Sequence, residues 1–142
     1  MKPREKSEVA RLVCDHRWQF KHLDCFRTQF GDAALFDALF DPFDSLSQTE
    51  YTFHNQQLVG KLLLELQPKC PITVQEAIER SLSQWNRSVE ELPWYLERCF
   101  GREAVLDAIT KIEQNDSLNS EELKELKTYR YWIIGPPGAN DG

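Results

Sequence analysis

Two cysteines and two histidines lie close together near the start of the chain, in the stretch CDHRWQFKHLDC. They are Cys14, His16, His22 and Cys25. Thiolate and imidazole groups are the ligands that zinc prefers in tetrahedral sites. However, the spacing matches none of the usual paired zinc motifs, and only His22 and Cys25 would share a helix face. We therefore expect reduced cysteines and surface histidines with no metal or other cofactor, and we keep a small metal-binding protein or enzyme as an alternative.

A third cysteine lies between arginines. Cys99 follows Arg98 directly and precedes Arg102 by three residues. Neighbouring cations lower the pKa of a thiol and make it nucleophilic. Cys99 also belongs to an apolar row at helical spacing, which predicts a buried and unreactive thiol instead.

Three aspartates recur in the stretch FDALFDPFDS, at positions Asp37, Asp41 and Asp44. Acid–base catalysis needs carboxyl groups whose environments drive their pKa values apart, and a run of aspartates more commonly forms a solvated acidic face. The chain contains no glycine-rich phosphate loop, calcium-loop spacing, HExxH motif or nucleophile elbow. The sequence therefore predicts a protein that is not an enzyme.

We expect the elements that position these residues to be helices, because four stretches carry the signature of a helix start. In each, a side-chain acceptor is followed three residues later by Glu, so that both ends of a capping box are present. The pairs are Ser47 with Glu50, Thr73 with Glu76, Ser88 with Glu91, and Asn119 with Glu122. No segment alternates apolar and polar residues as a half-buried strand would. We therefore expect an all-α fold, a compact array of six or seven helices around one long helix.

The expected helices follow the apolar periodicity. Their ranges are 22–30, 33–40, 48–66 (the long helix), 74–85, 93–100, 102–113 and 120–134. Gly31 and Gly101 are expected to end helices in a left-handed conformation. We expect no internal repeat, a single helical domain over residues 1–134, and a flexible C-terminal tail over 135–142 with the sequence GPPGANDG.

Two polar residues interrupt apolar stripes, Asn55 in the long helix and Arg130 in the last helix. A buried polar group needs a partner, so we expect each to be satisfied by a structural contact. The long helix also has a second apolar strip, with Phe53 and Leu64. This strip motivates one alternative function, a self-associating structural or regulatory helical protein, with a homodimer left open.

The overall charge directs the leading hypothesis. The formal net charge is −6 and the pI is about 5.1, which argues against nucleic acid and against an anionic membrane surface. The N-terminus has no apolar signal region and no apolar run approaches a membrane span, so we expect a cytoplasmic protein.

We expect this small acidic protein to act by protein–protein binding, as an immunity or inhibitor protein that neutralises a basic partner. Carboxylates would steer the encounter and aromatic side chains would anchor the complex. The predicted partner-binding residues are Asp37, Asp41, Asp44, Trp94, Tyr131 and Trp132.

Overall fold

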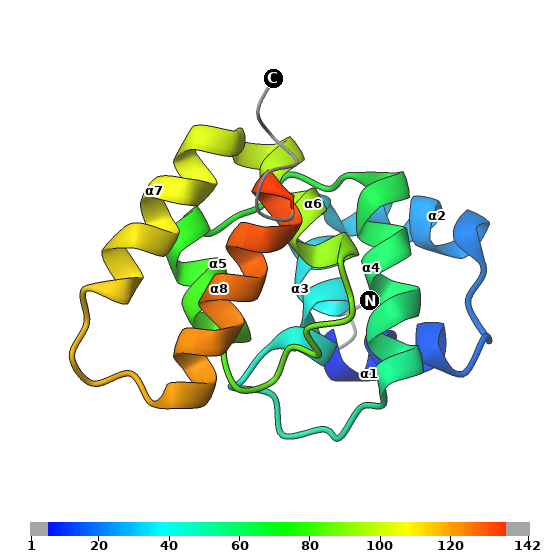
Figure 1. Ribbon diagram of the computed structural model, residues 1–142. Coiled ribbons are helices and arrows are strands. Elements are labelled where there is room, and N and C mark those ends of the chain that lie inside the picture. Colours follow the sequence, from blue (N-terminus) through cyan, green and yellow to red (C-terminus); the bar gives the residue numbers. More distant parts are fainter. Residues whose placement is uncertain (1–5, 136–142) are drawn as a thin grey trace.

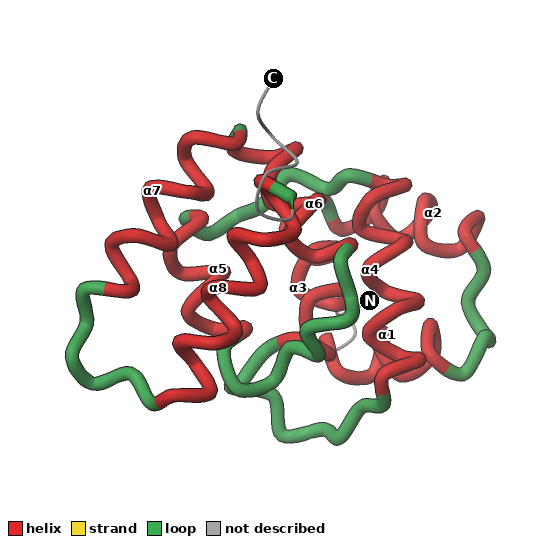
Figure 2. The backbone as a smooth tube through the Cα atoms, viewed as in Figure 1, coloured by secondary structure: helices red, strands yellow, loops and turns green. Residues whose placement is uncertain are grey.

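The computed structural model of the protein describes residues 6–135. All the regular secondary structure in that range is helical, and loops join the helices (Figures 1 and 2). The helices are α1 (Lys6–Cys14), α2 (Phe20–Phe30), α3 (Asp32–Phe40), the 3-10 turn η1 (Asp41–Phe43), α4 (Phe53–Leu66), α5 (Val74–Ser81), α6 (Glu91–Phe100), α7 (Arg102–Glu113) and α8 (Ser120–Ile134). The all-α prediction is therefore confirmed. Of the predicted tail, all residues after Gly135 lie outside the described range.

Two of the four predicted helix starts have the expected cap. The Thr73 hydroxyl accepts a hydrogen bond from the Glu76 backbone N–H at the start of α5. At the start of α8, Asn119 and Glu122 form the reciprocal capping box. Each cap satisfies backbone donors that the first turn of a helix cannot satisfy by itself.

The predicted start of the long helix is wrong. The chain enters α4 after Thr52, which forms a capping box with Asn55. Ser47 does not cap a helix: its hydroxyl donates to the Asp41 carboxylate at 3.0 Å and accepts from the Thr49 N–H, two residues ahead, at 3.2 Å. As a result α4 has 14 residues and α8 has 15, so the array does not surround a single long helix.

Two further elements differ from expectation. The helix α1 was not predicted, although it buries Val9, Ala10 and Val13 in the core. The helix α6 begins at Glu91 rather than at Pro93. Pro93 still lies in the first turn, where its missing N–H would have had no partner within the helix.

The described helices form two halves with the same arrangement. In each half the first helix packs on the third, the second on the third, and the third on the fourth. The first half is α1–α4 and the second is α5–α8, and the two halves meet where α4 packs against α6 (Figure 1). Buried apolar residues of both halves form one continuous cluster from Val9 to Ile133.

The sequence carries a trace of this arrangement. Residues 30–39 read FGDAALFDAL and residues 100–109 read FGREAVLDAI, with identical residues at five of ten positions. An offset of 70 residues also places α2 on α6 and α4 on α8 to within three residues at each end. The two halves therefore resemble each other in helix order and in part of their helix contacts, a likeness that the sequence analysis did not predict.

A glycine corner recurs in both halves. Gly31 joins α2 to α3 at φ +93°, and Gly101 joins α6 to α7 at φ +90°. Each glycine N–H donates to the carbonyl four residues earlier, at 2.7 Å, and each glycine carbonyl accepts from the N–H four residues later, at 3.2 Å. A side chain would strain this positive φ, which explains why the corners are glycine.

The two polar residues in apolar stripes both have structural partners, as expected. Arg130 makes a bidentate ion pair with Glu113, with N–O distances of 2.6 and 2.8 Å. Asn55 belongs to the α4 capping box and not to the core. The most deeply buried amide is instead Gln56, which hydrogen-bonds to three backbone groups.

Candidate functional site

The structure brings the three predicted aromatic anchors together where α6 meets α8. The Trp94 indole N–H donates to the Trp132 carbonyl at 3.3 Å, and the Trp132 indole N–H donates to the Arg87 carbonyl at 2.9 Å. The Tyr131 ring lies edge-on to Trp132 with centroids 5.1 Å apart and is 43% exposed. The two tryptophans are half-buried and fasten α6, α8 and the preceding loop, so only Tyr131 presents a large free face.

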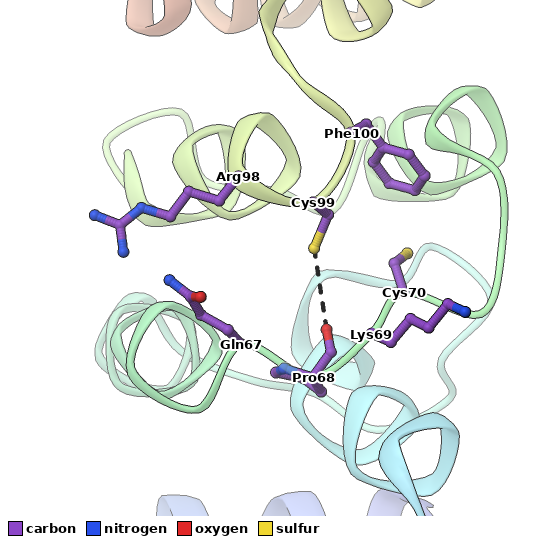
Figure 3. Close-up of a pocket in the computed structure, with 7 residues that line it drawn as sticks. All are labelled: Gln67, Pro68, Lys69, Cys70, Arg98, Cys99 and Phe100. Carbon is purple, nitrogen blue, oxygen red and sulfur yellow. Dashed lines mark hydrogen bonds between the residues drawn. The ribbon is translucent and has the colours of Figure 1, made fainter.

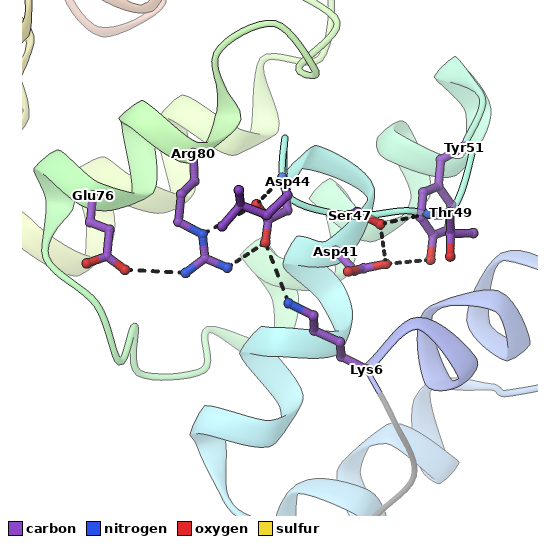
Figure 4. A network of polar contacts seen from close by, with 9 residues as sticks. Lys6, Asp41, Asp44, Ser47, Thr49, Tyr51, Glu76 and Arg80 are labelled. Carbon is purple, nitrogen blue, oxygen red and sulfur yellow. Dashed lines mark hydrogen bonds and ion pairs between the residues drawn. The ribbon is translucent and has the colours of Figure 1, made fainter.

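The predicted acidic face is largely internal, which corrects the sequence interpretation. Asp41 and Asp44 are each only 1% exposed. Asp41 accepts hydrogen bonds from Tyr51 at 2.7 Å and from Ser47 at 3.0 Å (Figure 4). Buried carboxylates with such partners hold local structure and are closed to a partner protein.

Asp44 is held by cations from distant parts of the sequence. Arg80 on α5 donates to both carboxylate oxygens, and Lys6 Nζ on α1 lies 3.7 Å from Oδ2 (Figure 4). The hydrogen bond that Arg80 donates to Asp44 raises the pKa of Arg80, so this guanidinium stays charged. The pairing explains the burial of Asp44, because an ion leaves water at tolerable cost only when it is paired and hydrogen-bonded.

Asp37 is the one exposed member of the predicted acidic cluster. Partial desolvation raises the pKa of its carboxyl, while the positive charges of Lys6 and Arg80 act in the opposite direction. It therefore lies at the edge of the Asp44 network. Its part in partner binding stays a prediction.

The cysteine–histidine cluster does not assemble as a metal site. Residues 6–135 contain no group of three or more His, Cys, Asp or Glu side chains placed to hold a metal ion. Burial raises the pKa of the Cys14 thiol to about 12, which disfavours the thiolate that a metal would need. The His22 ring accepts from the Gln19 backbone N–H at 3.3 Å and so helps to start α2.

A pocket of about 260 Å³ lies beside two other cysteines, which sequence reasoning did not place together (Figure 3). Cys70 comes from the α4–α5 linker and Cys99 from the end of α6, and Lys69 and Arg98 also line the pocket. The Cys99 sulfur points at the Pro68 carbonyl, 4.0 Å away. The only indication of this pocket in the sequence was the pair of prolines in the linker, which forces the chain to turn there.

The thiols of this pocket are not activated. Burial raises the pKa of Cys70 to about 11, and desolvation likewise raises the pKa of Cys99. Cys99 is exposed rather than buried as predicted, but both thiols are protonated at neutral pH. Neither thiol of the pocket therefore has the lowered pKa that is typical of an activated cysteine.

A larger hollow of about 340 Å³ opens between the start of α2 and the outer face of α4. We call it the α2–α4 hollow, and its lining residues are Val13, His16, Trp18, Gln19, Phe20, Leu58 and Leu62. The Phe20 side chain is 49% exposed at its rim. Sequence reasoning missed it because Trp18 and Phe20 precede the predicted helix and lie about 40 residues from Leu58 along the chain.

The residues proposed for self-association differ in exposure. Phe53 is 37% exposed at the start of α4. Leu64 is half-buried and packs against the core, so it offers little contact area.

Among the described helices, none combines the length and apolar character needed to span a bilayer. Comparisons with family models, with curated proteins and with solved structures found no match to the chain.

Proposed function

We propose that the protein acts by binding another protein, and that the partner docks in the α2–α4 hollow. The observation that carries this proposal is a contact made in one half and left open in the other. In the second half α6 packs directly against α8, whereas the corresponding helices α2 and α4 are not among the principal helix contacts and are joined by Arg27, which donates to the Leu66 carbonyl at 2.6 Å. Near the start of α2 the hollow opens beside α4, lined by apolar side chains from α1, the α1–α2 loop, α2 and α4.

Protein–protein recognition commonly places an amphipathic helix of one partner in an apolar groove of the other. The hollow has the composition that favours such contacts, because aromatic side chains supply much of the binding energy at protein interfaces. Trp18 and Phe20 on one side face Leu58 and Leu62 on the other.

A partner of basic character remains a prediction from the net charge of −6. Of the three aspartates proposed to steer such a partner, only Asp37 is exposed. The role of an immunity or inhibitor protein therefore rests on the overall charge and on contacts outside the Asp41–Asp44 network.

A single substitution tests the proposal by filling the hollow from within. Leu62 corresponds to Trp132 at the offset of 70, so Leu62→Trp places an indole where the second half already has one. A partner captured by the wild-type protein would be purified, and its affinity measured for both proteins. We expect the Leu62→Trp variant to lose binding, while Leu123→Trp, an indole on the exposed face of α8, retains it. Equal affinity for the three proteins would refute docking in the hollow.

A further inference from the structure

The α2–α4 hollow continues into a second hollow along α4. This second hollow of about 270 Å³, which we call the histidine hollow, shares His16 and Leu58 with the first and extends to His54 and Lys61. Along α4 the two cover His54 to Leu62, about 12 Å at 1.5 Å per residue. That length matches about two turns of a helix laid against α4.

The second half shows which side chain suits the hollow. There, the space between the loop before α6 and the fourth helix is occupied by Trp132, whose indole N–H donates to the Arg87 carbonyl. At the offset of 70 residues, Leu62 corresponds to Trp132 and Arg17 corresponds to Arg87. The smaller Leu62 leaves the corresponding space open, so the hollow accommodates an aromatic side chain supplied from outside.

The charges around the two hollows differ from those of the whole chain. The 23 Asp and Glu residues outnumber the 17 Lys and Arg residues. Yet among the described residues that line either hollow there is no carboxylate, and the ionisable lining comprises Cys14, His16, His54 and Lys61. Arg17 and Lys21, both exposed, lie next to lining residues in the chain, as does the exposed Asp15. Together with Lys61 these side chains carry three positive charges against one negative charge, and this local excess favours an acidic partner segment.

His16 lies at the junction of the two hollows. It follows the end of α1 by two residues with φ +60°, a left-handed conformation that costs a non-glycine residue free energy. His16 and Leu58 line both hollows. A carboxylate of a segment bound at this junction would lie beside the imidazole.

We propose that these hollows bind a short amphipathic helix of a partner protein, with one aromatic side chain, best an indole, in the α2–α4 hollow and carboxylates beside Lys61 and His16. This inference rests on the proposed function, and for the docked segment it replaces the basic character predicted from the net charge of −6 with an acidic one. The aromatic ring would lie among Trp18, Phe20 and Leu62.

Defined peptides test the inference without a known partner. The probe is a fluorescently labelled, helix-forming peptide of about 14 residues with one central Trp and Glu at the flanking positions one turn away. One matched peptide has Lys in place of Glu, and another has Ala in place of Trp. Binding to the full chain would be followed by fluorescence anisotropy at low salt, where charge contacts are least screened.

We expect the Glu–Trp peptide to bind the wild-type protein and both matched peptides to bind at least about tenfold more weakly. Leu62→Trp should abolish binding, and Lys61→Glu should weaken it about tenfold and improve binding of the Lys peptide. The control Lys124→Glu, an exposed charge reversal on α8, should leave the affinity unchanged.

Four results would overturn the inference. Equal binding of the Glu and Lys peptides would refute the acidic partner, and tighter binding of a single-stranded oligonucleotide would replace the class of partner. A wild-type dimer in sedimentation that is lost in Leu62→Trp, with no peptide binding, would make a second copy the occupant. If a captured protein binds the wild type but not Leu62→Trp while no acidic peptide binds, the proposed function stands and this inference fails.

Discussion

Replacing Gln56 by leucine should destabilise the fold more than any other single amide substitution on α4. Gln56 is 3% exposed, and its side-chain amide donates to the carbonyls of Pro42 at 2.9 Å and Gln84 at 2.8 Å. Its side-chain oxygen accepts from the Asn86 N–H at 2.8 Å. Leucine has a similar size but leaves all three backbone groups without this partner. A buried backbone group that loses its partner costs about 1–3 kcal/mol, and we use about 1 kcal/mol for each group because Asn86 lies near solvent. The expected loss for the three groups is then about 3 kcal/mol.

Urea denaturation of the purified protein gives the free energy of unfolding directly, and thermal melting gives an independent value. For a chain of this size, about 3 kcal/mol corresponds to a fall in Tm of about 10 °C. Gln57→Leu is the matched control, because Gln57 is half-exposed on the next position of the same helix. It should change stability by less than about 0.5 kcal/mol. A Gln56→Leu variant as stable as this control would show that the three hydrogen bonds do not hold α4 to its neighbours.

Three further predictions concern packing, acid stability and thiol reactivity. Gly60→Ala should cost about 2 kcal/mol in a denaturation assay, because the new Cβ would lie 2.9 Å from the Glu91 Cβ and push α4 away from α6. The Arg130 hydrogen bond lowers the pKa of Glu113, so this pair stabilises the fold above the ordinary carboxyl pKa of 4.5 and loses that effect as the pH falls through the lowered value. Arg130→Met should therefore flatten the acid limb of stability against pH, by less than about 1 kcal/mol because the pair is partly exposed, and an unchanged limb would contradict the pairing. Alkylation of Cys70 by iodoacetamide should be slow at about pH 8 and accelerate toward its raised pKa of about 11, whereas rapid reaction at neutral pH would show an activated thiol.

Local signals in the sequence predicted much of the helical layout. Gly31 and Gly101 marked corners because a helix end with positive φ favours a residue without a side chain. Thr73 and Asn119 marked helix starts because a cap depends only on residues within one turn. Such features could be predicted because the interacting groups are neighbours in the chain.

Features that depend on distant residues were missed. Ser47 has a capping sequence, but its hydroxyl bonds to the distant Asp41 carboxylate and to the Thr49 N–H within a turn, and α4 starts at Thr52 instead. Asp44 was expected at the surface, and its burial depends on Arg80, 36 residues further along the chain. The α2–α4 hollow likewise combines residues 13–20 with Leu58 and Leu62 of α4, and no local pattern in the sequence specifies that these segments lie together.

The contact between α4 and α6 has a consequence for symmetry. If the halves were related by a two-fold axis, α8 would meet α2 in the same way, but among the described helices that pair is absent from the principal contacts. The halves are therefore not related by a two-fold axis. The contact between them uses the last helix of one half and the second helix of the other, so the surfaces of α2 and α8 that correspond to this contact do not meet each other.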